Sequence, residues 1–244
     1  MPGNKIVYMF NVGIAGVSYE SLINLIDNTI KENGKKIIGY ATVHNLNIIY
    51  LNPHIREIFN KFDLIHPDGI GVFLGSRFLY KKSGFMKRMT GSDFYPVLIN
   101  ESIKNKWNLF LFGEKEEILK KVNIDNLNVV GKISGYNFNT EDVILSINNS
   151  GTDILLVGLG CPLQEEWIVN NKERLNAKII LAVGEGIKVL AGVKKRGPVF
   201  LRSLGLEWVT RLILNPKKLW NRYVFGIPLF IYRIIKYKFH TIQL

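Results

Sequence analysis

The chain has 244 residues, of which 47% are hydrophobic and 21% charged, so it can bury a sizeable core and is not a disordered polymer. Its net charge of +12 predicts an anionic partner, such as a phosphate-bearing substrate, an anionic lipid or a nucleic acid. The single cysteine, Cys161, excludes an internal disulfide framework and favours a reducing compartment. We expect neither a signal peptide nor a transmembrane helix, because no apolar segment has the required length and flanks.

Short β-like runs alternate with helical patterns over residues 1–193, which predicts an α/β fold with a Rossmann-like, largely parallel sheet and helices on both faces. The expected strands are residues 6–10, 36–43, 64–66, 107–112, 129–133, 154–158 and 179–183. Helical patterns cover residues 18–30, 46–62, 70–80, 93–104, 114–121, 141–148 and 164–175. The composition changes near residue 194, which separates this domain from a C-terminal helical appendage, residues 194–244.

Polar or glycine-rich segments follow several of the expected strands. In open α/β sheets, ligands bind beyond the carboxyl ends of the strands. Such ends are expected at residues 42–45, 66–71, 158–165 and 184–186. Their convergence makes these segments the first candidates for a functional site.

Asp68 ends an apolar strand and precedes Gly69. A carboxylate in that position faces the crevice at the strand ends, where it could act as a general base. An aspartate also commonly caps a following helix, here residues 69–80. The spacing alone leaves both roles open.

The turn that contains Gly158 and Gly160 joins a strand to a helix, so it suits a diphosphate, although it departs from the dinucleotide fingerprint. Gln164, in the first turn of that helix, could donate to a phosphate or a sugar. Arg88 lies close in sequence to the hydroxyl of Thr90 and could neutralise the charge on a leaving diphosphate. Arg88 could equally be a surface cation in a basic patch.

Two histidines and the cysteine are weaker candidates. His44 and His66 could act as ligands or acid–base groups, or serve a structural role. No second His, Cys or acid stands at a metal-ligand spacing, and no Asp-x-Asp motif occurs, so we predict no metal site. Cys161 lacks an obvious base nearby and is expected to be packed rather than nucleophilic.

The appendage is basic and apolar at once. Residues 194–244 contain eleven Lys or Arg and one acid, a net charge of +10, which leaves +2 for residues 1–193. The uncharged run 223–232 is too short to span a bilayer, and we expect Pro228 to break it. This pattern favours an interfacial helix on an anionic membrane. The alternatives are a final pair of helices packed on the core, or a nucleic-acid partner, which no recognition motif supports.

Four blocks of the chain resemble the WecG/TagA/CpsF glycosyltransferases, family 26. They occur in the family's order at residues 67–72, 88–93, 157–168 and 205–212. The resemblance implies an inverting, metal-independent and cofactor-free hexosyltransferase. Its donor would be a UDP-sugar and its acceptor a sugar on a polyprenyl diphosphate. It would build cell-surface polysaccharide or a teichoic-acid-type polymer, as a peripheral protein at the cytoplasmic face of a bacterial inner membrane.

The resemblance also assigns roles to residues. It implies that residues 1–193 form the catalytic domain, with Asp68 as the base and Arg88 at the diphosphate. The expected substrate-binding residues are Thr42, His44, Asn45, Gly69, Thr90, Gly158, Gly160, Gln164, Glu185, Arg211 and Arg222. Arg211 and Arg222 belong to an appendage that docks on the membrane and helps close the site. Glu185 stands where the family usually has glycine and could contact the ribose or the base.

Two alternatives stay open at this point. A non-catalytic scaffold or binding protein at the membrane surface could have the same fold. The apolar appendage could also pack against a second copy of the chain and form a homo-oligomer.

Overall fold

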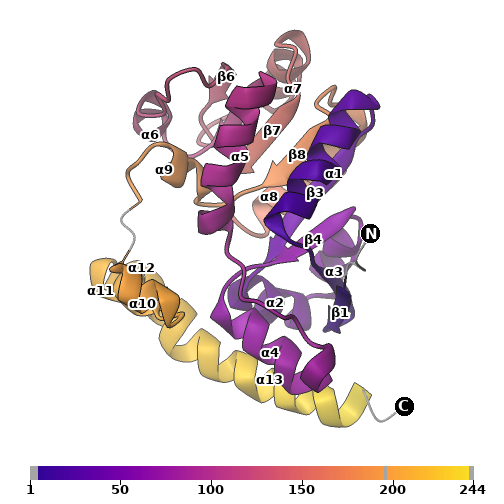
Figure 1. Cartoon of the computed structure of the whole chain (residues 1–244), viewed down its shortest axis with the longest axis vertical. Helices are drawn as coiled ribbons and strands as arrows, with labels where there is room; N and C mark the ends of the chain where they lie inside the picture. The colour runs from indigo at the N-terminus through magenta and orange to yellow at the C-terminus, as the bar shows by residue number, and fades with distance from the viewer. Residues whose placement is uncertain (1–4, 195–196, 242–244) are drawn as a thin grey trace.

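The computed structural model describes residues 5–194 and 197–241. Lys195 and Arg196, two cations of the predicted basic appendage, lie outside this part. Six strands form one parallel sheet in the order β4-β3-β8-β7-β5-β6 (Figure 1). These strands are β3 (Lys36–Ala41), β4 (Leu64–Pro67), β5 (Leu109–Gly113), β6 (Val129–Ile133), β7 (Ile154–Gly158) and β8 (Ile179–Ala182). The Rossmann-like α/β architecture is therefore confirmed.

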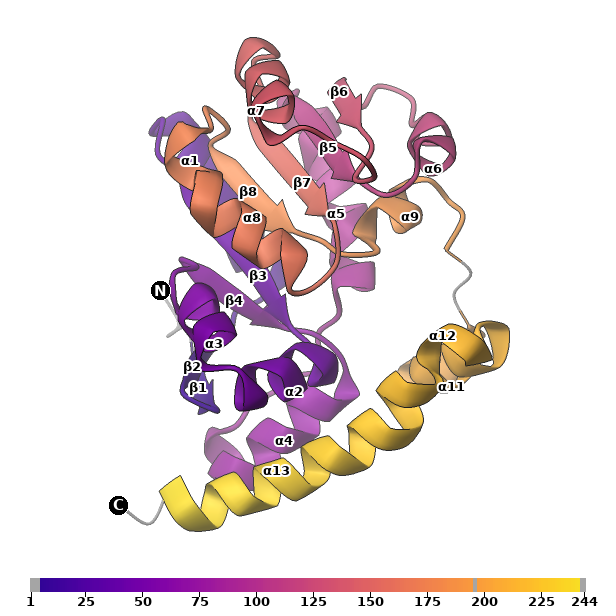
Figure 2. The same cartoon turned by 180° about the vertical axis from the view of Figure 1, so that it is seen from behind.

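The sheet is covered on both faces because alternate side chains of each strand point to opposite sides. Leu155 and Val157 enter one core, whereas Ile154 and Leu156 enter the other. The first core packs against α2 (Val43–Leu51), α3 (Pro53–Asn60), α4 (Ile70–Tyr80), α7 (Thr140–Asn149) and α8 (Leu163–Asn171). The second core packs against α1 (Tyr19–Lys31), α5 (Gly91–Asn105), α6 (Glu116–Lys120) and α9 (Gly186–Leu190). Figure 2 shows α7 and α8 on the face that Figure 1 turns away from the viewer.

The N-terminal strand is not part of the main sheet, so our assignment of residues 6–10 to it was wrong. β1 (Lys5–Met9) pairs antiparallel with β2 (Val12–Gly16) in a separate hairpin. The two turn residues, Phe10 and Asn11, have φ values of 53° and 63°. A two-residue hairpin turn of type I′ requires such left-handed backbone at both central positions. Neither residue is a glycine, which is why the turn gave no clear signal in the sequence.

The expected helix 46–62 is two helices, and the single-helix prediction was wrong. Pro53 lacks the N–H that a continuous helix requires, so it begins α3 instead. The side chain of Asn52 caps α3 by accepting from the backbone N of Ile55 at 3.3 Å. In the same way Thr42 ends β3 earlier than expected, because its hydroxyl caps α2 by accepting from the N of Asn45 at 3.1 Å.

The appendage is helical and folds back on the domain. It consists of α10 (Val199–Ser203), α11 (Glu207–Leu214), α12 (Pro216–Trp220), one turn of π-helix (Asn221–Phe225, called the π-turn below) and α13 (Gly226–Thr241). The expected break at Pro228 was wrong, because the proline is the third residue of α13, and the first turn of a helix tolerates a missing N–H. Figures 1 and 2 both show α13 running along α2 and α4.

Packing and polar bonds attach α13 to the domain. Phe230 and Ile234 are buried and belong to the core that also contains α2 and α4. The amide of Asn47 on α2 donates to the carbonyl of Gly226 at 2.7 Å, and its oxygen accepts from Arg233 at 2.9 Å. Within the described part of the chain, no helix combines the length and apolar composition needed to cross a membrane.

Candidate active site

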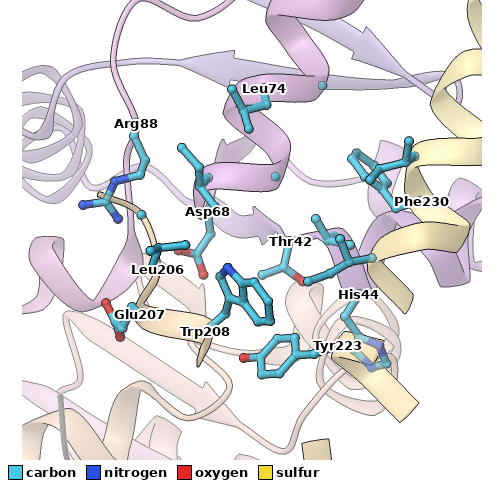
Figure 3. A pocket seen from close by; sticks show the side chains of 18 of the residues that line it. Thr42, His44, Asp68, Leu74, Arg88, Leu206, Glu207, Trp208, Tyr223 and Phe230 are labelled. Atoms are coloured by element: carbon cyan, nitrogen blue, oxygen red, sulfur yellow. The ribbon is translucent and has the colours of Figure 1, made fainter. Parts of the chain in front are cut away.

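The carboxyl ends of β3 and β4 open into a cavity of about 570 Å³, whose other walls come from α4, α11, the π-turn and α13. Figure 3 shows Asp68, Thr42 and Trp208 close together in this cavity. Eight of the expected site residues line it: Thr42, His44, Asp68, Gly69, Arg88, Thr90, Arg211 and Arg222. Segments from both ends of the chain therefore meet at the strand ends where the sequence predicted a site.

Asp68 does not cap the helix that follows it. The N-cap of α4 is Gly69, which has φ 93° and no side-chain cap. The Asp68 Oδ1 instead accepts from the backbone N of Gly91, the first residue of α5, at 3.1 Å. This bond orients the carboxylate and places it at the positive end of a helix dipole. An ionised carboxylate can accept about four hydrogen bonds, so Asp68 keeps the capacity to accept one from a substrate hydroxyl.

Tyr19 fixes the backbone of Thr90, the residue before the Gly91 N–H that binds Asp68. The phenolic oxygen of Tyr19 accepts from the N of Thr90 at 2.9 Å and donates to the carbonyl of Thr90 at 3.0 Å. The Thr90 hydroxyl caps α5 by accepting from the N of Asp93 at 3.2 Å. Tyr19 and Asp93 thus position Thr90 and, one residue later, the Gly91 N–H that contacts Asp68.

His66 has a structural position rather than a place in the cavity. Its buried ring lies within hydrogen-bond distance of two carbonyls, that of Pro67 at 3.0 Å and that of Val17 at 3.1 Å. Burial lowers the pKa of His66, while both carbonyls and the charge of Asp68 act in the opposite direction. His66 thereby links the end of β4 to the segment that leads into α1.

Three arginines, Arg88, Arg211 and Arg222, line the cavity together with the acids Asp68 and Glu207. Burial alone would lower the pKa of Arg211, but its ion pair with Glu207 and the charge of Asp68 raise it above the usual value. Guanidinium groups bind phosphate oxygens in a bidentate manner, so these arginines suit a diphosphate.

His44 and Lys194 each lie near one of these arginines and have lowered pKa values. Burial lowers the pKa of His44 to about 4, and the charge of Arg222 contributes to the shift. His44 is therefore neutral at neutral pH and can exchange hydrogen bonds without adding charge. Burial, together with Arg211, lowers the pKa of Lys194 to about 8. The Lys194 Nζ lies 3.8 Å from Glu185 Oε2.

The expected residues that follow β7 and β8 do not line the cavity. The Gln164 Oε1 accepts from the N of Gly160 at 3.3 Å and from the N of Gly184 at 3.0 Å. Its amide nitrogen donates to Glu165 at 2.8 Å. Gln164 therefore joins the turn after β7 to the turn after β8. Substrate contacts by Gln164, Gly158, Gly160 and Glu185 stay predictions, as does one by Asn45, which is buried in the first turn of α2.

Cys161 is a poor candidate nucleophile, as expected. It forms a cis peptide bond with Pro162 at the start of α8. Burial and the adjacent Glu165 raise the pKa of its thiol far above the usual range, so the reactive thiolate is suppressed.

Apolar and aromatic residues from α4 and the appendage complete the cavity, and of these only Leu206 and Trp208 belong to the four sequence blocks. The full set is Leu74, Phe78, Leu204, Leu206, Trp208, Tyr223, Ile227, Phe230, Ile231 and Ile235. One signal was available in Gly205, which has φ 76°. A Cβ there would lie 2.9 Å from the Cγ1 of Ile70, so glycine lets the appendage approach the start of α4.

The cavity joins residues from three of the four sequence blocks that carry the family resemblance. The model of the glycosyl transferase WecG/TagA/CpsF family matches residues 7–243. The chain belongs to this family. It is a glycosyltransferase, and the resemblance inferred from the four blocks is confirmed.

Curated relatives of this WecG/TagA/CpsF glycosyltransferase come from Staphylococcus aureus. Proteins of strains MRSA252 and NCTC 8325 / PS 47 are each 29% identical to it over 243 residues, which cover 93% of both chains. Both are named N-acetylglucosaminyldiphosphoundecaprenol N-acetyl-β-D-mannosaminyltransferase. The match to the family model, residues 7–243, extends through the appendage and includes the cavity-lining helices α11 and α13.

The four blocks have different positions in this glycosyltransferase. The first provides Asp68, the second Arg88 and Thr90, and the fourth Trp208 and Arg211, and all of these line the cavity. The third forms the turn after β7 and the start of α8. Among residues 5–194 and 197–241, no three His, Cys, Asp or Glu side chains gather as a metal site would require. Metal independence nevertheless stays a prediction.

Proposed function

We propose that this glycosyltransferase moves a sugar from a UDP-sugar to a sugar carried on a polyprenyl diphosphate, with inversion at the anomeric carbon. The observation that carries the proposal is the shared cavity, which is lined by Asp68 and by the three arginines Arg88, Arg211 and Arg222. The relatives' name supplies the acceptor class, since it specifies a diphosphoundecaprenol acceptor.

The proposed reaction is a single displacement. Asp68 takes the proton of an acceptor hydroxyl as the hydroxyl oxygen forms a bond to the anomeric carbon. The bond from that carbon to the UDP oxygen breaks on the opposite face, so UDP leaves as an anion and the configuration inverts. Arg88, Arg211 and Arg222 offset the negative charges of the phosphates. Proton transfer to a positioned base contributes roughly 10²–10⁴-fold to such a step.

The surface of the appendage supports a membrane location for this reaction. Large apolar side chains are exposed along it, including Phe200, Ile213, Trp220, Phe225 and Tyr232. The same helices carry the excess positive charge of the chain. Exposed apolar and aromatic residues interspersed with cations are typical of peripheral binding to anionic lipid. We therefore place the enzyme on the cytoplasmic surface of a bacterial inner membrane, where it would build a cell-surface polymer.

Transfer assays with the purified chain test the reaction. Candidate donors, including UDP-N-acetylmannosamine, are supplied with a polyprenyl diphosphate N-acetylglucosamine acceptor in the presence of a metal chelator. We expect release of UDP and a disaccharide product whose anomeric configuration is opposite to that of the donor. Binding of UDP-sugar with no transfer to any acceptor would instead favour a non-catalytic scaffold.

A flotation assay tests the membrane location. We expect the chain to bind vesicles that contain phosphatidylglycerol and not vesicles of phosphatidylcholine alone. Trp220→Ser and Phe225→Ser alter exposed side chains and should weaken binding without affecting the fold. Leu145→Ser is the matched control, because it changes an exposed apolar residue of α7 that lies outside the appendage. Equal loss in all three variants would argue against the appendage as the membrane contact.

A further inference from the structure

One half of the cavity is an apolar groove between α4 and α13. Leu74 and Phe78 lie one turn apart on α4, and Ile227, Ile231 and Ile235 are spaced one turn apart on α13, so each set forms a row on one side of its helix. Both rows line the cavity. Figure 3 shows Leu74 on α4 and Phe230 on α13, with Glu207 on the opposite side of the view.

The floor of the groove is closed by a tight contact between the two helices. A Cβ on Gly75 would lie 3.1 Å from the Cζ of Phe230, so the absence of a side chain at Gly75 lets α13 approach α4. Phe230 and Ile234 are buried at this contact. The row from Ile227 to Ile235 extends for about 12 Å at the helical rise of about 1.5 Å per residue.

The walls of the groove are more exposed than apolar side chains of this size usually are. Leu74 is 56% exposed, Phe78 41%, Ile231 52% and Ile235 42%. Exposed apolar residues that line an open groove are typical of a binding site for an apolar ligand. The groove continues directly into the polar part of the cavity, where Asp68 and the three arginines lie.

We propose that this α4–α13 groove binds the part of the acceptor's polyprenyl chain that lies next to its diphosphate. The inference rests on the proposed function for the identity of the acceptor. A diphosphate joined to a branched hydrocarbon chain matches a cationic pocket joined to an apolar groove, whereas a nucleotide sugar has no apolar part to place there. The groove is short, so it holds only the first units of the chain and the remainder extends into the bilayer.

The other apolar surface of α13 is distinct from this groove. Leu229 and Tyr232 are exposed on α13 but do not line the cavity. In the proposed location on a membrane, they face lipid while the row of Ile227, Ile231 and Ile235 faces the acceptor. Leu229 is therefore a matched control for Ile231, because both are exposed aliphatic residues of the same helix.

Calorimetric titration in the absence of vesicles and detergent tests the groove directly. The full chain is titrated with inorganic diphosphate, geranyl diphosphate and farnesyl diphosphate. Farnesyl diphosphate has one isoprene unit more than geranyl diphosphate. Burial of one methylene tightens binding about four-fold, so burial of two carbons of that unit makes the farnesyl compound bind about 15-fold more tightly than the geranyl compound. We expect this ratio of the two affinities in the wild type and in Leu229→Ser. In Leu74→Ser/Ile231→Ser it should approach one, with the affinity for inorganic diphosphate unchanged.

Unchanged binding of inorganic diphosphate also shows that the double variant is folded, and the single variants Leu74→Ser and Ile231→Ser should each lower the ratio in part. Equal affinity of the wild type for all three ligands would overturn the proposal. So would a double variant that keeps the ratio but loses vesicle flotation, because the two residues would then be bilayer contacts. Chain-length dependence without sugar transfer would refute the proposed enzyme and keep the groove, whereas transfer without chain-length dependence would do the reverse.

Discussion

One buried polar cluster helps to attach α13 to the domain, and a single substitution removes two of its hydrogen bonds. Arg233 is 5% exposed, donates to the backbone and side-chain oxygens of Asn47 at 2.9 Å each, and lies 4.8 Å from the ring centre of Tyr50. The amide of Asn47 also donates to Gly226. Asn47→Ala deletes the side-chain bonds at both ends of the cluster but leaves the bond from Arg233 to the backbone oxygen.

The expected cost follows from the two bonds that are lost. A hydrogen bond to a charged group contributes about 1.5–3 kcal/mol and one between neutral groups about 0.5–1.5 kcal/mol, so together they give roughly 2–4 kcal/mol. If this loss falls on the local opening of α13, hydrogen-exchange protection of its amides should decrease by about 30-fold to about 900-fold. Sugar transfer should also weaken, because α13 and the preceding π-turn line the cavity.

Hydrogen exchange measured by mass spectrometry resolves α13 from the rest of the chain. Asn148→Ala is the matched control, since the Asn148 side chain bonds to the carbonyl of Arg174 and the N of Asn176 at 2.8 Å each, away from α13. That variant should leave exchange in α13 unchanged. If Asn47→Ala also leaves exchange in α13 unchanged, the buried cluster does not hold α13 on the domain.

Three further predictions concern the site and its closure. Tyr19→Phe leaves both backbone groups of Thr90 without their partner, so urea denaturation should show a loss of about 1–3 kcal/mol, with a lower kcat at nearly unchanged donor KM. Gly205→Ala forces a left-handed alanine against Ile70 and should loosen the turn before α11, which limited proteolysis would detect as faster cleavage there. Burial lowers the pKa of His44 to about 4, below its value of about 6.5 in the unfolded chain. The folded state therefore favours the neutral ring, and this contribution to the free energy of unfolding is fully present above pH 6.5 and is lost as the pH falls towards 4. Denaturation across this range should show wild type losing about 1–3 kcal/mol more than His44→Gln.

The parallel sheet could be predicted from the sequence because its strands are continuous apolar runs. The segments of β5, β7 and β8 are completely buried, and such runs alternate with helical patterns. The hairpin of β1 and β2 was missed since its second strand contains Gly13 and Gly16, which weaken a strand pattern. Gly16 has a packing reason, because a Cβ there would lie 2.6 Å from the ring of Phe85.

The polar part of the candidate site was predictable, whereas its apolar part was not. Asp68 and Thr42 follow strands, so the general position of ligands in α/β folds identifies them. The groove residues Leu74 and Ile231 come together only because α13 folds back onto α4. A local sequence pattern gives a helix its apolar sides but does not specify which side packs on the core, which lines a cavity and which meets a membrane.

In the proposed reaction Asp68 removes a proton from the acceptor, and the turnover of Asp68→Asn tests this role most directly. The asparagine keeps an oxygen that can accept from the N of Gly91 but cannot act as a base. Asp63→Asn is the matched control, because Asp63 also accepts from a backbone N, that of Ile37 at 2.8 Å, beside the opposite end of β3. We predict that Asp68→Asn lowers kcat at least about 100-fold with UDP binding retained, while Asp63→Asn keeps its turnover. Near-normal turnover by Asp68→Asn would contradict the account.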